Sequence, residues 1–314
     1  MSVFAGDLFG DLDLQACCRS VRVSDYPHGL LEVLSAAPAG TWMYTGGLEN
    51  HPDLVERMEP LGRLWGNTAA CLRQVRNPLA VFEALSRHGL SAPRVAERCD
   101  NLPTDGTWLV KDRRSAGGSG VAVWRGNGPL AADVYFQEHI AGQPCGAVYL
   151  AAGGEAVFLG VTQQLLGAGP VADGRTAAAK DFRYAGSIGP LALEPEVLAG
   201  FHSLGRTLAA EFPLSGLFGV DVVVAGQTIW PVEINPRYTA SVEILERGGH
   251  QSLLAWHAAA CADRSLPASA IAAAAAAGAT PAIVWGKRIL FSRHDLEVGE
   301  RTVAHLLTAT CTTL

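Results

Sequence analysis

The N-terminal part of the chain alternates short apolar runs with stretches in which apolar residues recur every three or four positions. The runs predict strands, and the stretches predict helices. Strands that alternate with helices favour a parallel sheet covered on both faces. The predicted strands are 2–5, 41–47 and 63–66, and the predicted helices are 29–37, 53–61 and 78–88.

From residue 107 onward the pattern changes to apolar strands joined by glycine-containing turns. Apolar residues at helical spacing predict helices over 194–212 and 243–262. The alanine-rich stretch 268–279 is expected to be a helical or flexible connector. The predicted strands of this part are 108–111, 121–124, 135–140, 147–152, 156–163, 220–225, 229–235, 282–287 and 288–291.

One predicted hairpin carries acidic residues on both of its strands. Asp221 lies within an apolar run, and Glu233 and Asn235 lie two residues apart on the second strand, so these two project from one face. If residues 226–228 form the turn, Asp221 lies directly opposite Glu233, whereas a two-residue turn sends the carboxylates to opposite faces. We expect the three-residue turn or an equivalent bulge.

The hairpin has the chemistry of a metal site. Mg²⁺ prefers oxygen ligands and usually takes one or two carboxylates together with substrate phosphates. Arg237, just beyond the second strand, could offer a fixed fork of donors to an anion. A surface hairpin with solvated acids is the alternative. The apolar neighbours favour burial of the acids, and a buried charge needs a partner.

A lysine at the end of a predicted strand precedes a glycine-rich loop. Successive N–H groups of such a loop can cradle phosphate oxygens, and the lysine adds a positive charge. The spacing matches neither the P-loop nor the dinucleotide fingerprint, and a flexible hairpin tip is the alternative. The phosphate-binding candidates are Lys111, Ser115, Gly117, Gly118, Ser119 and Gly120.

Two further segments offer candidate ligands. Gln137, Glu138 and Ile140 lie on a predicted strand that could hold an adenine edge, the alternative being an edge strand with solvated polar residues. Lys180 and Arg183 lie in a polar insertion and are candidates to bind a carboxylate or phosphate, the alternative being solvated loop cations.

Taken in order, these motifs resemble the ATP-grasp superfamily over residues 70–260. The resemblance implies an ATP-grasp fold, α/β plus α+β, in which two lobes enclose ATP behind a Rossmann-like pre-domain. The usual first strand and glycine-rich turn of that pre-domain are not recognisable, so we expect a shortened one. The implied parts are 1–76 as pre-domain, 77–262 as ATP-grasp domain (ATP lobe 92–142, metal lobe 143–262) and 263–314 as connector and C-terminal strands.

The resemblance also implies roles for the candidates. Lys111 would contact the phosphate and the adenine of ATP, the loop 115–120 would close over the phosphates, and Glu138 with the backbone near Ile140 would hold the adenine. One or two Mg²⁺ ions, or Mn²⁺ as the alternative, would be bound by Asp221, Glu233 and Asn235. Arg237, Lys180 and Arg183 would act on the transferred phosphate and the substrate.

The implied activity is a ligase that joins a carboxylate to an amine through an acyl phosphate. An ATP-grasp kinase and a non-catalytic ATP-binding protein with a degenerate pre-domain are the alternatives. The segments 42–50 and 160–165 look most similar to a branch of ligases from one-carbon cofactor pathways that includes tyramine–glutamate ligase.

Composition narrows the class of partners. The 314-residue chain has a formal net charge of −6 with both signs scattered, which gives no electrostatic footprint for nucleic acid or an anionic membrane. The seven cysteines show no metal-binding spacing, and the N-terminus shows no secretory leader. Both observations favour a cytoplasmic protein with small-molecule substrates, and a homodimer is left open.

Overall fold

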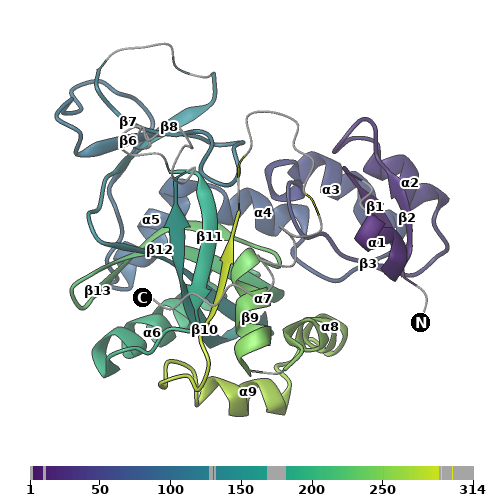
Figure 1. Ribbon diagram of the computed structural model, residues 1–314. Helices are drawn as coiled ribbons and strands as arrows, with labels where there is room; N and C mark the ends of the chain where they lie inside the picture. The colour runs from purple at the N-terminus through teal and green to yellow at the C-terminus, as the bar shows by residue number, and fades with distance from the viewer. Residues whose placement is uncertain are drawn as a thin grey trace.

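The computed structural model of the chain describes residues 3–9, 12–126, 130, 132–167, 182–249, 251–289, 291 and 299. Figure 1 shows three parts: a large sheet with helices packed around it, a small sheet above one end of it, and a helix-rich N-terminal lobe beside it. None of the described helices is both long and apolar enough to cross a membrane.

The N-terminal lobe (residues 3–9 and 12–67) contains two separate parallel strand pairs instead of the single sheet that the alternation predicts. After Trp42 the chain leaves the ladder, and Tyr44 enters the core of the lobe, where its hydroxyl donates to the carbonyl of Asn67 (2.7 Å). The elements are β1 (Phe4–Asp7), α1 (Leu12–Cys17), β2 (Arg19–Arg22), α2 (Leu30–Ala36), β3 (Thr41–Trp42), η1 (Leu48–Asn50), α3 (Pro52–Met58), η2 (Glu59–Leu61) and β4 (Arg63–Leu64).

Two short helices, α4 (Ala69–Val75) and α5 (Pro78–Arg87), follow this lobe, and the apolar pattern predicts only the second. Pro78 occupies the first turn of α5, where its missing N–H is tolerated, and the Asn77 side chain accepts hydrogen bonds from the N–H groups of Leu79 and Ala80. The chain therefore begins a new helix here, and Arg76 lies in the break between the two.

The small sheet has the order β5-β8-β6-β7 and is antiparallel throughout. Trp108, Trp124 and Phe136 form its apolar core, with Trp124 and Phe136 in edge-to-face contact. Its strands are β5 (Val95–Ala96), β6 (Trp108–Asp112), β7 (Val121–Val123) and β8 (Val134–Glu138).

The large sheet has the order β13-β12-β9-β10-β11-β14. Alternate residues of β9 enter two different clusters: Tyr149 packs with Phe201 of α6, and Leu150 packs with the cluster that contains Val242 of α7. This period of two is that of a sheet with both faces covered. The elements are β9 (Gln143–Ala152), β10 (Glu155–Leu166), β11 (Tyr184–Gly189), α6 (Pro195–Glu211), β12 (Gly216–Ala225), β13 (Thr228–Asn235), α7 (Ala240–Gly249), α8 (Leu253–Asp263), α9 (Ala268–Ala274) and β14 (Trp285–Arg288).

The structure differs from the sequence predictions at three places in this part, although the region 243–262 is helical as predicted. The predicted helix 243–262 is two helices, α7 and α8, and Ser252 caps the second by accepting from the N–H of Ala255. The predicted strands 282–287 and 288–291 are one strand, β14, which pairs with β11. The sequence pattern does not predict β11, because three of its six residues are glycine or serine.

Candidate active site

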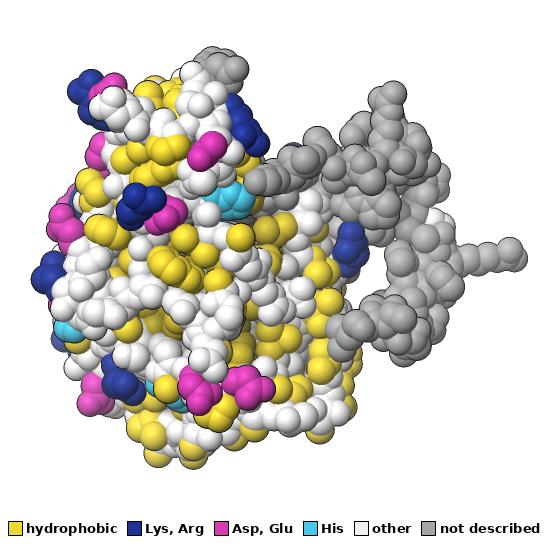
Figure 2. All heavy atoms as spheres, turned by 90° about the vertical axis from the view of Figure 1, so that its left-hand side faces the viewer, with side chains coloured by type: hydrophobic (Ala, Val, Ile, Leu, Met, Phe, Trp, Pro, Cys, Tyr) yellow, Lys and Arg dark blue, Asp and Glu magenta, His cyan; other side chains and the backbone are white. Residues whose placement is uncertain are grey.

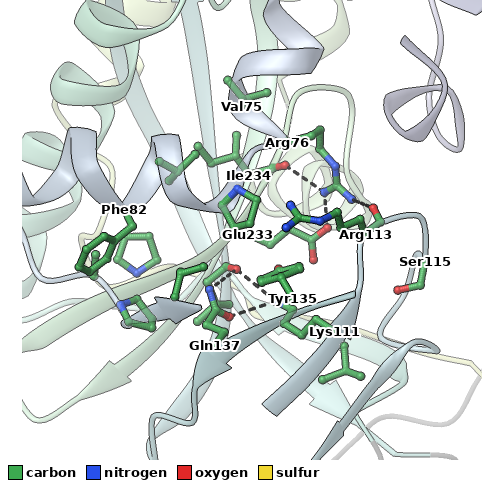
Figure 3. A pocket seen from close by; sticks show the side chains of 18 of the residues that line it. Val75, Arg76, Phe82, Lys111, Arg113, Ser115, Tyr135, Gln137, Glu233 and Ile234 are labelled. Atoms are coloured by element: carbon green, nitrogen blue, oxygen red, sulfur yellow. Dashed lines mark hydrogen bonds and ion pairs between the residues drawn. The ribbon is translucent and has the colours of Figure 1, made fainter. Parts of the chain in front are cut away.

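A cavity of about 320 Å³ lies between the small sheet and the large sheet. A smaller cavity of about 60 Å³ adjoins it and shares Lys111, Gln137 and Glu233 with it (Figure 3). Most of the sequence candidates line the larger cavity: Lys111, Ser115, Gly117, Gly118, Gln137, Glu138, Ile140, Asp221, Glu233, Asn235 and Arg237.

Asp221 and Glu233 lie opposite each other in the hairpin of β12 and β13, as predicted. A bulge produces this register, not a three-residue turn. Ala225 pairs with Thr228, so the turn contains two residues and the predicted three-residue turn is wrong. The pairing then shifts between Val222, opposite Pro231, and Asp221, opposite Glu233. This bulge adds one residue to β13 and returns the two carboxylates to the same face, which confirms the prediction of an equivalent bulge.

Asp221 is held by two amide donors. Gln164 Nε2 donates to Oδ1 (2.7 Å), and Asn235 Nδ2 donates to Oδ2 (3.1 Å). Burial, followed by the negative charge of Glu233, raises the pKa of Asp221 to about 6. A carboxylate in this position therefore gains from a nearby positive charge.

Glu233 has a cationic partner, Arg76, whose Nη1 donates to Oε1. Figure 3 shows Arg76 reaching from the break between α4 and α5 toward Glu233. Burial opposes ionisation of Glu233, but Arg76 and then Lys111 hold its pKa below the usual value. The second terminal nitrogen of Arg76 donates to Asn50 Oδ1 (2.8 Å), so the N-terminal lobe is tied to the same group.

Lys111 is buried and bridges the two sheets. Its Nζ donates to Gln137 Oε1 (3.1 Å) on β8 and to the carbonyl of Val232 (3.2 Å) on β13, as Figure 3 shows in part. Val232 is the additional residue of the bulge, and its carbonyl also accepts from Gln137 Nε2 (3.2 Å). The bulge therefore both aligns the acids and offers a carbonyl to the small sheet.

The glycine-rich loop lies over the start of β11. The N–H of Tyr184 donates to the carbonyl of Gly117 (2.9 Å), and a Cβ on Gly118 would lie 2.0 Å from the carbonyl oxygen of Phe182. Asn50 Nδ2 donates to the carbonyl of Arg114 (3.0 Å). Of the loop candidates, Ser119 and Gly120 are not among the described residues that line the cavity.

The remaining candidates differ in their positions. Glu138 lines the cavity but both of its oxygens accept from Arg94 (3.1 and 3.2 Å). Arg183 is exposed, with its guanidinium over the ring of Phe291 (5.7 Å), and it is not among the described residues of the cavity wall. Lys180 lies outside the described residues.

Three residues that contact the candidate site residues were not predicted from the sequence. Glu49, Arg76 and Gln164 touch the candidates from η1, from the helix break and from β10. Gln164 had a weak signal, a polar residue in a long apolar strand. Glu49 and Arg76 reach the site from parts of the chain 188 and 157 residues away from their partners, and no local pattern marks them.

The donor set suits a hard divalent cation. Asp221, Glu233 and Asn235 supply two carboxylates and one amide, and like charges face each other in the Asp221–Glu233 pair. Among the described residues there is no group of three or more His, Cys, Asp or Glu that could hold a metal ion. Such a set favours Mg²⁺, which keeps water or phosphate oxygens in its other positions, over a metal that needs a full protein cage.

Comparison with known families gives one match. The sequence model of the ATP-grasp domain matches residues 75–241, which is more than half of the chain. The search of curated protein sequences found no match to the chain.

Solved structures share this fold at low identity. An ATP-grasp superfamily protein from Archaeoglobus fulgidus has 19% identity and a TM-score of 0.57, over 77% of this chain and 70% of the other. An L-amino acid ligase from Bacillus licheniformis has 15% identity and a TM-score of 0.62, over 88% and 70%. Biotin carboxylase from Campylobacter jejuni, in complex with a β,γ-ATP compound, has 13% identity and a TM-score of 0.63, over 85% and 67%.

Proposed function

Because the chain belongs to the ATP-grasp domain family, we propose that it is an ATP- and Mg²⁺-dependent ligase that joins a carboxylate to an amine. Carboxylate–amine ligases are among the proteins that share its fold, which supports this reaction class. The two substrates are small molecules, and participation in one-carbon cofactor synthesis stays a prediction. We also propose that the chain divides into a pre-domain (1–76), an ATP-grasp domain (77–262) and a connector with C-terminal strands (263–314).

One observation carries the proposal: a single cavity brings a phosphate-binding set and a cation-binding set together. Lys111 and the glycine-rich loop line it from the small sheet, and Asp221, Glu233 and Asn235 line it from the hairpin. Phosphoryl transfer depends mainly on positioning and on neutralising charge, and these are the groups that do so.

The residues take the following roles. Asp221, Glu233 and Asn235 hold Mg²⁺, which when bound neutralises charge on the phosphates of ATP. Lys111 and the backbone N–H groups of the loop 115–120 bind the same phosphates. Gln137, Ile140 and the neighbouring backbone hold the adenine, with Glu138 kept in place by Arg94. Arg237 binds the substrate carboxylate and later the acyl phosphate. Arg183 is not among the described residues of the cavity wall and Lys180 lies outside the described residues, so we assign neither a role.

The proposed reaction has two steps. A carboxylate oxygen of the first substrate attacks the γ-phosphorus of ATP, the bond from that phosphorus to the bridging oxygen breaks, and ADP leaves. The amine nitrogen of the second substrate then attacks the acyl carbon, the bond to the phosphate oxygen breaks, and phosphate leaves as the nitrogen loses a proton.

The test is a phosphate-release screen of carboxylic acids against amines with Mg-ATP, with glutamate and tyramine among them. We expect phosphate release that requires both an acid and an amine. A phosphorylated product with ADP and no need for an amine would indicate a kinase. Nucleotide binding without turnover of any pair would contradict the ligase.

A further inference from the structure

The residues that line the larger cavity include a buried carboxylate with an unused oxygen. Glu49 is 2% exposed, and its Oε1 accepts from Arg237 Nε at 2.6 Å. Its Oε2 is buried and has no hydrogen-bond partner among the described residues. Both side chains line the cavity. Because a buried carboxylate oxygen without a donor is costly, this atom points to a donor that comes with a ligand.

The neighbouring hydroxyl groups do not supply this donor. Tyr26 donates to the carbonyl of Gly46 (2.8 Å), and Tyr44 donates to the carbonyl of Asn67 (2.7 Å). Burial raises the pKa of both tyrosines, and the negative charge of Glu49 raises it further. Both hydroxyl groups therefore lie close enough to Glu49 to interact with its charge. Each hydroxyl has a single proton, so neither can also donate to Glu49.

Arg237 next to it keeps donors for an anion. The guanidinium has five N–H groups. Three of them are used, by Glu49 Oε1, by the carbonyl of Tyr238 (3.1 Å) and by Asn235 Oδ1 (3.4 Å), which leaves two without a partner among the residues that the structure describes. The site thus presents a cation with free donors and an anion with a free oxygen side by side.

We propose that this corner binds an α-amino acid, with its ammonium group on Glu49 Oε2 and its carboxylate on Arg237. In an α-amino acid these two charges are separated by one carbon, which matches anchors that touch each other. The inference rests on the proposed function and names the class of its acid substrate. The contact of Arg237 with Asn235 places that carboxylate beside the predicted metal ligands.

The first test needs no knowledge of the natural amine. Hydroxylamine replaces it as nucleophile: its nitrogen attacks the acyl carbon and loses a proton, phosphate leaves, and the hydroxamate that forms is measured as its coloured complex with ferric iron. The full-length protein with Mg-ATP is given each of the twenty common amino acids and its desamino counterpart, such as alanine with propionate and glutamate with glutarate. We expect hydroxamate from at least one amino acid, at about tenfold or more the rate of its counterpart, because the counterpart leaves Glu49 Oε2 unpaired.

The second test uses Glu49→Gln, which keeps an acceptor for Arg237 Nε but replaces the free oxygen by a donor. We expect KM for the amino acid to rise about tenfold or more, with KM for ATP unchanged and the desamino acid used as well as before. A role limited to holding Arg237 would weaken both acids equally. Glu32→Gln, an exposed glutamate of the same lobe on α2, is the matched control and should change neither.

The outcomes are distinct. Equal hydroxamate formation from amino and desamino acids, or equal losses for both in Glu49→Gln, would overturn the assignment of Glu49 while leaving the ligase in place. Hydroxamate from no acid, with nucleotide bound, would overturn the proposed function and this inference with it.

Discussion

Asp221 and Glu233 lie directly opposite each other although the turn that joins their strands contains only two residues. A regular hairpin with this turn would place them on opposite faces. The bulge at Val232 corrects the register, and the carbonyl that it frees accepts from Lys111 and Gln137. One additional residue therefore aligns the two acids and connects the hairpin to the small sheet.

The first prediction concerns Glu233. Glu233→Gln keeps an acceptor for Arg76 but removes a charge from the proposed metal site, so we expect ATP-dependent turnover to fall by about 100-fold or more. The fold should survive, as measured by circular dichroism and thermal unfolding. The exposed Glu196 on α6 is the matched control, and Glu196→Gln should retain full activity. Unchanged turnover in Glu233→Gln would count decisively against the site.

The pKa of Asp221 predicts a pH dependence of nucleotide binding. Burial and Glu233 raise this pKa to about 6, whereas the pKa of Glu233 is lowered, so the pair takes up one proton on Asp221 as the pH falls through about 6. Since a metal needs the carboxylate form, we expect the affinity for Mg-ADP to fall below this pH, by up to about tenfold per pH unit. Calorimetric titrations from pH 5 to 8 measure this.

The reference for that experiment is Asp221→Asn, because the nucleotide phosphates titrate in the same range. The variant should bind more weakly and lose the additional pH dependence, and identical profiles would contradict the prediction. In the unliganded protein, protonation of Asp221 has the opposite effect, because it favours folding. A carboxyl whose pKa is raised on folding favours the folded state at low pH, and this contribution is lost as the pH rises through about 6.

The sequence predicted the parts of the site that are local in the chain. Lys111 and its loop, and the acids of the hairpin, stand out because strands alternate with a period of two and glycines mark turns. Glu49 and Arg76 could not be predicted in this way, since their partners are brought to them only by packing of the lobes. The same reason explains β11, which pairs with β10 and β14 rather than following a local apolar pattern.

The ion pair of Arg76 with Glu233 predicts a loss of stability. Arg76→Met leaves a mostly buried carboxylate without its cation, so we expect the free energy of unfolding to fall by about 1–3 kcal/mol in urea denaturation. Arg73, one turn earlier on α4, provides the matched control. Its side chain is 41% exposed, against 16% for Arg76, and it pairs with two exposed acids, so Arg73→Met should change little. Equal losses of stability in the two variants would show that the ion pair with Glu233 stabilises the fold no more than the exposed pairs of Arg73 do.

The glycine-rich loop predicts different costs at two adjacent glycines. Both have positive φ, +60° at Gly117 and +76° at Gly118, so alanine strains the backbone at either position. A Cβ at Gly117 meets nothing within 4 Å, whereas at Gly118 it collides with the carbonyl of Phe182 and must displace the loop from the start of β11. We therefore expect Gly118→Ala to raise the KM for ATP about tenfold more than Gly117→Ala does, a difference of about 1.4 kcal/mol. Steady-state kinetics with ATP varied measures this. Equal KM values would mean that the contact of the loop with Phe182 does not position it for ATP.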